Sequence, residues 1–396
     1  MTRISLRSRP RLSPYAHLAV FFFLFFTTQT TGQYVQIYLY GIGLSKTRIG
    51  LITGTAGLIA LVFQPLLGGL ADASSSKKRL LGLVIGAAAA AFPVMYFGTS
   101  AGWIFLFYTL YHIFFSFAMT LNTSVSVEYC QQVGRPFGPL RMLGALSYSL
   151  MMLVIGSVTG KTVDSIFLIF PAACLLSLCF LAGIPDVRGG NSRNSGLARI
   201  SPTALLKDRT VMVLIAFQTL IGVATGISNG FFSIYFTDDM HGSAQLYSVC
   251  IAVAAMAEVP FLFLTDRWLD GMGYRRLLML LCGLTALRNL LCFLASSVGM
   301  LMLARCMSCF SVMEGVTYSL ILVRIVRPQL KTSAQTLSAT VQNVANLMVS
   351  SYLGGFLADL VGIRPLFGVS AVLTAAICLI FTLVVFPRTI REESVR

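Results

Sequence analysis

The chain has 396 residues, of which 56% are hydrophobic and 11% are charged, and its formal net charge is +15. A soluble globular protein carries charge on roughly a quarter of its residues, so this composition excludes an ordinary soluble domain and predicts a polytopic membrane protein. The basic residues lie in short clusters between apolar runs, which argues against a nucleic-acid-binding surface and indicates membrane topology.

The first apolar run follows a basic N-terminus and begins near Tyr15. It continues through a Thr- and Gln-rich stretch, 27–33, to Tyr40 without an obvious cleavage site, so we expect a transmembrane helix with a polar inner face rather than a signal peptide. Further apolar runs of sufficient length to cross a bilayer lie near 48–71, 79–99, 102–130, 138–160, 165–184, 209–237, 244–265, 275–296, 298–325, 333–361 and 364–386.

These runs predict an all-α polytopic membrane protein with twelve transmembrane helices in two pseudo-symmetric halves. The first six-helix bundle covers 1–185, a polar middle loop covers 186–208, and the second six-helix bundle covers 209–396. Basic residues gather in the tails and loops on one side, whereas the opposite loops hold Lys46, Arg48, Lys161 and Arg364. Because short cytoplasmic loops are enriched in Lys and Arg, we expect both termini in the cytoplasm and the protein in the cytoplasmic (inner) membrane.

Two short matches relate the halves to each other. Ile37-Tyr-Leu39 recurs as Ile234-Tyr-Phe236, and Lys78-Arg-Leu-Leu81 recurs as Arg275-Arg-Leu-Leu278, so that both matches have the same spacing in the chain. Duplicated six-helix halves are typical of secondary transporters, whose halves rock about a site near the membrane midplane.

Two loops carry a resemblance to a known family. Gly68-Gly-Leu-Ala-Asp72 followed by Lys77-Lys78-Arg79 resembles the loop between helices 2 and 3 of the major facilitator superfamily, and Asp270-Gly-Met-Gly-Tyr-Arg275-Arg276 resembles a degraded copy of it. The resemblance implies a conformational latch, in which a carboxylate at a helix end meets basic residues. Simple marking of the cytoplasmic side by basic residues is the alternative.

The segment Phe137–Tyr148 narrows the resemblance to the lactose permease-like branch, which contains proton symporters of oligosaccharides, nucleosides and phenylpropionate. The resemblance implies that Arg141 contacts substrate hydroxyls and that Tyr148, seven residues later on the same helical face, stacks on the substrate where the permease has a tryptophan. Glu128 resembles the carboxylate that pairs with this arginine.

Polar residues on other helices complete the expected substrate site. Gln29, Gln33 and Gln36 are spaced by four and three residues, so they form a stripe that faces the cavity or makes hydrogen bonds between helices. Helices 7 and 11 lack the permease's charge pair and offer amides instead, among them Asn229, Gln342 and Asn343.

Glu314 is a carboxylate in the middle of an apolar run, 308–323. Desolvation disfavours its charged form, so we expect it to be protonated or paired with a cation on another helix. The resemblance implies a proton-coupling centre of Glu314, Glu258 and Arg288 at similar depth, with structural salt bridging as the alternative. Ser311 stands where the permease has a histidine.

The sequence has no GxxxxGK[ST] phosphate loop and no HExxH motif, which argues against ATP-driven transport and zinc hydrolysis. We therefore predict a non-enzymatic secondary transporter that works by alternating access and takes up a small polar solute with protons. A sugar, oligosaccharide or nucleoside is expected ahead of an aromatic acid. Protons are the coupling ion, with no other cofactor, no metal and no nucleic acid, and the protein is expected to work as a monomer in the bilayer. The alternatives are efflux by proton antiport and a non-transporting membrane sensor on the same fold.

Overall fold

The computed structural model describes residues 13–74, 76–159, 162–184, 208–326, 331–381 and 383, leaving aside the side chains of 72–73, 259, 262–267, 269–270 and 331–333. In these ranges the chain forms helices and no strand. Apart from Asp208, the predicted middle loop lies outside the described residues, as do both chain ends.

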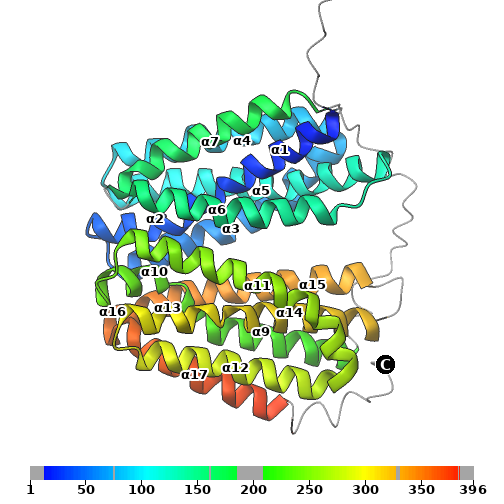
Figure 1. The fold of residues 1–396 in the computed structure, drawn as a ribbon. Helices are drawn as coiled ribbons and strands as arrows, with labels where there is room; N and C mark the ends of the chain where they lie inside the picture. The colour runs from blue at the N-terminus through cyan, green and yellow to red at the C-terminus, as the bar shows by residue number, and fades with distance from the viewer. Residues whose placement is uncertain are drawn as a thin grey trace, which may run out of the picture.

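The helices form two bundles stacked one above the other in Figure 1. The N-terminal bundle consists of α1 (Pro14–Thr27), α2 (Gln29–Gly41), α3 (Lys46–Ala73), α4 (Lys77–Val94), α5 (Ala101–Gln132), α6 (Gly138–Thr159) and α7 (Ile166–Leu181), with short 3-10 turns at Met95–Phe97 and Val163–Ser165. The C-terminal bundle consists of α9 (Arg209–Asn229), α10 (Phe232–Ile234), α11 (Ala244–Met272), α12 (Tyr274–Leu294), α13 (Val298–Cys306), α14 (Ser308–Ile325), α15 (Lys331–Ala345), α16 (Gly354–Val361) and α17 (Ile363–Ile380), with π-helical stretches η3 (Tyr235–Asp239) and η5 (Asn346–Leu353).

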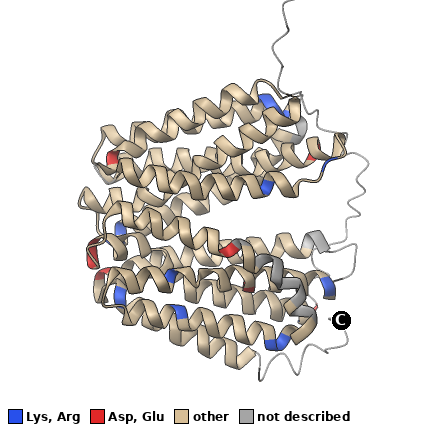
Figure 2. Cartoon of the chain, in the orientation of Figure 1, with Lys and Arg blue, Asp and Glu red and all other residues tan. Residues whose placement is uncertain are grey.

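Ten helical segments among the described residues are long and apolar enough to cross a membrane. The combined α1–α2 rod and α11, which contains Pro260, fall outside that set. If each of these is counted as one further span, the number reaches the twelve that the sequence predicts. Figure 2 shows that charged residues are sparse along the helices, as a lipid environment requires.

The first predicted span is interrupted at Thr28 rather than continuous. The hydroxyls of Thr27, Thr28, Thr30 and Thr31 each donate to the carbonyl three residues earlier, at distances of 2.6 to 2.8 Å. Hydroxyls that bond back to their own helix compete with its ladder and bend it. The threonine cluster therefore separates α1 from α2, a break that hydropathy alone does not reveal.

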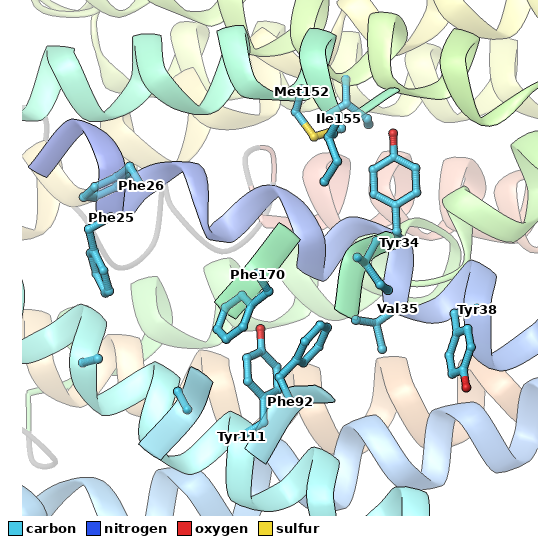
Figure 3. Close-up of a cluster of buried hydrophobic side chains, with 14 of the residues drawn as sticks. Phe25, Phe26, Tyr34, Val35, Tyr38, Phe92, Tyr111, Met152, Ile155 and Phe170 are labelled. Carbon is cyan, nitrogen blue, oxygen red and sulfur yellow. The ribbon is translucent and has the colours of Figure 1, made fainter. Parts of the chain in front are cut away.

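Aromatic rings fill the interior of the N-terminal bundle. Phe92 of α4 packs against Tyr111 of α5 and Phe170 of α7, with ring centroids 4.7 Å away in both cases. Phe25 of α1 lies in the same cluster, as Figure 3 shows. Rings at these separations combine area burial with favourable edge and offset contacts, so this cluster ties together four helices of the bundle.

The sequence repeat corresponds to a structural repeat. Tyr38 at the end of α2 packs on Phe167 of α7 with ring centroids 4.7 Å apart. Its counterpart Tyr235 packs on Phe367 of α17 at 5.1 Å. Both pairs join the first and the last spans of their own bundle, so the duplicated motif performs the same packing role twice.

One end of the molecule, which we call the closed end, holds the loops at 42–45, 162–165, 240–243 and 362. Here the bundles are fastened together. Asp359 of α16 accepts hydrogen bonds from the backbone amides of Lys46 and Thr47 at 3.0 and 2.7 Å, and from the Thr47 hydroxyl at 2.6 Å. Tyr40 donates to Asp238 at 2.9 Å.

Close backbone approach also holds the closed end together. A Cβ on Gly50 of α3 would collide with the carbonyl of Ser351 in η5, and one on Gly54 would crowd the same residue. Glycine at these positions lets two helices from different bundles approach closely.

The opposite end, which we call the terminal end, holds Ser13, Ile184 and Asp208 and the end of α17. Near it Arg141 of α6 is exposed, and Leu146 and Asn343, further along α6 and α15, are exposed as well. In Figure 1 the bundles lie further apart at this end than at the closed end. In this conformation the two bundles are therefore in contact at the closed end and further apart at the terminal end.

Candidate functional site

Glu314 lies inside the C-terminal bundle and is 4% exposed. Gln218 of α9 donates from Nε2 to its Oε2 over 3.4 Å, and its Oε1 has no hydrogen-bond partner. Among the residues that the structure describes, no cation lies within ion-pair distance of this carboxyl. An unpaired charge at such a place is very costly, so the neutral, proton-bearing form fits this environment.

Arg288 does not meet Glu314. Thr285 of α12 and Ser311 of α14 are joined by a hydrogen bond of 3.1 Å between their hydroxyls. Consecutive spans run in opposite directions, so Arg288 lies beyond this bond toward the closed end and Glu314 lies beyond it toward the terminal end. Three residues of helix rise about 4.5 Å, which separates the two side chains' positions by about 9 Å along the bundle. The expected centre at a single depth is corrected to two separate places, because adjacent helices are antiparallel.

Arg288 instead belongs to a polar cluster on the closed-end side of that bond. Its side chain is 3% exposed and donates to Asn289 Oδ1 from Nε at 3.2 Å and from Nη2 at 2.7 Å. Nη2 also approaches Asn229 Oδ1 at 3.4 Å. Arg305 Nη1 donates to the same Asn229 oxygen at 3.0 Å. The predicted substrate residue Asn229 thus joins two arginines.

Arg305 is the site residue that the sequence reasoning did not select. It lies on α13, next to the junction with α14 at Met307, and its guanidinium lies over the Phe232 ring with 4.5 Å to the centroid. Glu258 of α11 lies within electrostatic reach of Arg305 and close to the Ser308 side chain. A charged group in an apolar run is costly to bury, and this argument selected Glu314 in the sequence. It applies equally to Arg305, so the sequence contained the information needed to select this residue.

Tyr148 brings the N-terminal bundle to this cluster. It lies on α6, partly exposed, within electrostatic reach of Arg305, Glu258 and Tyr34. Arg141, two turns nearer the terminal end, is exposed and lies 5.8 Å from the centroid of the Phe26 ring. Tyr148 therefore lies near the cluster, whereas Arg141 lies two turns further along α6.

Glu128 is placed differently from what the resemblance implies. It forms an ion pair with Lys77 of α4 and accepts a hydrogen bond from Ser124 at 3.2 Å. The carboxylate lies near the end of α5 at the terminal end. It pairs with Lys77 of α4, and no ion pair between it and Arg141 occurs among the described residues.

The three glutamines of the first span make hydrogen bonds to different bundles. Gln29 donates to Met119 of α5 at 3.2 Å. Gln33 accepts from Tyr247 of α11 at 3.3 Å, and Gln36 accepts from Ser233 of α10 at 3.2 Å. Two of the three therefore join the halves.

Gln342 and Asn343, the amides predicted on the eleventh span, lie on α15 and apart from the arginine cluster. Gln342 Nε2 donates to Ser338 at 2.7 Å, and Ser338 is also bonded to Tyr318 at 2.5 Å. Asn343 is exposed.

The predicted latch residues lie at the terminal end. Lys78 donates to the carbonyls of Ala182, at 2.8 Å, and Ile184 at the end of α7 within its own bundle. Gly68 is partly exposed, Arg79 and Arg276 are exposed, and Arg275 is half-buried, whereas the side chains of Asp72 and Asp270 lie outside the described set. The fastening that joins the bundles in this conformation is at the other end, where Asp359 meets backbone amides.

Comparison with known proteins gives a consistent result. The model of the MFS_1 like family matches residues 15–369. The uncharacterized transporter YwbF of Bacillus subtilis (strain 168) is 24% identical over 337 residues, which cover 84% of this chain and 83% of that protein. The raffinose permease of Escherichia coli is 22% identical over 299 residues, 68% of each chain.

Solved structures show the same fold. The nucleoside transporter NupG superposes with a TM-score of 0.79 at 18% identity, covering 93% of this chain and 98% of that one. The D-xylose-proton symporter superposes with a TM-score of 0.65 at 14% identity, covering 96% and 98% of the two chains.

Proposed function

This chain belongs to the MFS_1 like family and is a multi-pass membrane transporter, and on that premise we propose that it couples uptake of a small polar solute to protons. The observation that carries the proposal is Glu314, a carboxyl buried among helices with one oxygen unpartnered and no cation beside it among the described residues. Such a group holds a proton when its surroundings exclude water and releases it when they admit water or a cation. Alternating access supplies that change of surroundings.

A sugar, oligosaccharide or nucleoside is the proposed solute class. Matched relatives and structures include a raffinose permease, a nucleoside transporter and a D-xylose-proton symporter. This chain offers a ring and two amides beside the contacts between the bundles, namely Tyr148, Gln33 and Asn229. Rings and amides suit hydroxyl-rich solutes, since amides both donate and accept hydrogen bonds.

We also propose that the terminal end faces the cytoplasm across the inner membrane. Lys77, Lys78, Arg79, Arg135 and Arg276 lie at that end, where short loops rich in basic residues stay cytoplasmic. The described conformation would then be open to the cytoplasm. A reporter active only in the cytoplasm, fused after Arg396, should be active, and an inactive fusion would reverse the orientation.

The test of proton coupling is uptake into proteoliposomes of sugars, oligosaccharides, nucleosides and aromatic acids, with and without an imposed pH gradient. Glu314→Gln keeps the shape of the side chain but cannot carry a proton, so the variant should exchange solute across the membrane and fail to accumulate it uphill. Asp164→Asn, which changes an exposed acid in the short 3-10 turn before α7 at the closed end, is the matched control and should accumulate normally.

Accumulation by Glu314→Gln equal to that of the unmodified protein would remove Glu314 from the coupling step. Uptake driven by a gradient of the opposite sign would indicate efflux by antiport. If no solute in the panel crosses, the sensor alternative takes the place of transport.

A further inference from the structure

The arginine cluster contains two guanidiniums, and neither forms an ion pair with a carboxylate of the residues that the structure describes. Arg288, which is 3% exposed, and the partly exposed Arg305 both donate to the neutral oxygen of Asn229. Within the described part of the chain, no carboxylate oxygen lies within 4.0 Å of either guanidinium. Two like charges that share one amide oxygen in a membrane interior are expensive unless an anion joins them. The arrangement therefore points to a ligand that carries negative charge.

Arg305 has unused capacity for such a ligand. Its Nε is buried without a hydrogen-bond partner, whereas Arg288 has Nε and Nη2 occupied by Asn289. A guanidinium can hold a carboxylate through two parallel hydrogen bonds, and Nε is one of the donors that such a fork uses. Because the Arg305 side chain is partly exposed, a solute can reach its guanidinium, although Nε itself is buried in this conformation. Arg288, which shares the Asn229 oxygen with Arg305, adds positive potential.

The surroundings of Arg305 are suited to a solute rather than to a structural ion. Phe232 lies beneath the guanidinium, and Tyr148 from the other bundle lies within its electrostatic reach. Glu258 lies within electrostatic reach of Arg305, and no ion pair joins the two among the described residues. The carboxylate of a solute would thus enter beside Glu258 and between the two bundles.

We propose that Arg305, supported by Arg288 and Asn229, forms a subsite for the carboxylate of the transported solute, so that the solute is an acid such as a sugar acid or an aromatic acid. This assignment rests on the proposed transport function and changes its solute class: in place of an uncharged sugar or nucleoside, the transported solute carries a carboxylate. Glu258 competes with the bound carboxylate for Arg305.

The test uses equilibrium binding to the purified full-length protein in detergent, with no gradient. Each pair of probes differs at one group, which is a carboxylate in the acid and an uncharged alcohol or amide in its partner: D-galacturonate against D-galactose, and benzoate against benzamide. A charge-assisted hydrogen bond stabilises by more than a neutral one, so at least one acid should bind about tenfold more tightly than its neutral partner. Arg305→Gln should remove this preference by weakening the acid alone, and Arg305→Lys should retain part of it.

Arg364→Gln is the matched control, because Arg364 donates to the carbonyl of Phe293 at the closed end and lies outside the cluster. It should keep the preference for acids. Equal binding of acid and neutral partner, a preference that survives in Arg305→Gln, or binding of no acid in the panel overturns the assignment. If Arg305→Gln does not fold, the comparison of acid and neutral probes on the unmodified protein still decides. This measurement uses no pH gradient and is therefore independent of the uptake assay. A protein without a preference for acids can still show proton-coupled uptake, and a protein that prefers acids can lack it.

Discussion

Both bundles bury aromatic rings, but they differ in their buried charged groups: Lys77 of the N-terminal bundle is paired with Glu128, whereas Arg288 and Glu314 of the C-terminal bundle form no ion pair among the described residues. The N-terminal bundle buries rings such as Phe92, Tyr111 and Phe170, which need few hydrogen-bond partners. The C-terminal bundle buries Arg288 and Glu314 at 3% and 4% exposure, and each buried ionisable group lowers stability unless a function keeps it. The difference indicates that the first bundle serves as a rigid wall of the transport path, whereas the second carries the groups that change state.

The strongest test of this comparison removes a ring from the first bundle. Phe92→Ala leaves a cavity among α4, α5 and α7, and such truncations lower the free energy of unfolding by about 3–5 kcal/mol. Phe97→Ala, at a ring that is 80% exposed, is the control and should change stability by about 0.5 kcal/mol or less. Unfolding in detergent followed by intrinsic fluorescence measures both. Equal effects of the two variants would mean that the aromatic cluster is not the support of the bundle.

A smaller effect on stability should distinguish the two repeated tyrosines, Tyr38 and Tyr235. Tyr235 donates its hydroxyl to the carbonyl of Cys292 at 3.0 Å, so Tyr235→Phe should lower the free energy of unfolding by about 1 kcal/mol. No hydrogen bond of the Tyr38 hydroxyl is described, and Tyr38→Phe should be close to neutral. The same unfolding measurement compares the variants, and a larger loss from Tyr38→Phe would reverse the expected asymmetry.

The smallest effect is expected at Glu314 itself. If the carboxyl carries a proton in the folded protein, Glu314→Gln replaces a neutral group by another of similar shape, and stability should change by about 0.5 kcal/mol or less. A loss as large as that of Phe92→Ala would show that Glu314 is a structural ion rather than a proton carrier. Measuring unfolding beside the uptake assay keeps folding and coupling apart.

The spans were accessible from sequence because each depends on a local property, the length of an apolar run. The predicted span 138–160 corresponds to α6, and 275–296 corresponds to α12. The break at Thr28 was missed because it comes from hydroxyl groups that bond to their own helix, and hydropathy does not register them. Family membership was likewise accessible from local motifs such as Gly68–Asp72.

The site was less accessible because it depends on which side chains converge. The sequence places Arg288 and Glu314 each near the middle of a span. Because the two helices are antiparallel, the side chains lie on opposite sides of the Thr285–Ser311 bond. Glu128 was assigned to Arg141 by analogy and meets Lys77 instead. Arg305 was passed over because it lies near the start of its span, although Asn229 joins it to Arg288.

The hydrogen bonds of Asp359 have an evolutionary consequence. Two of the three come from the main chain of Lys46 and Thr47, at the first turn of α3, where free amides and the helix dipole favour a carboxylate. A main-chain donor is the same whatever side chain stands at that position. Substitutions at 46 can therefore accumulate without any compensating change at 359, and a search for covarying pairs between the bundles would overlook the contact that shuts them.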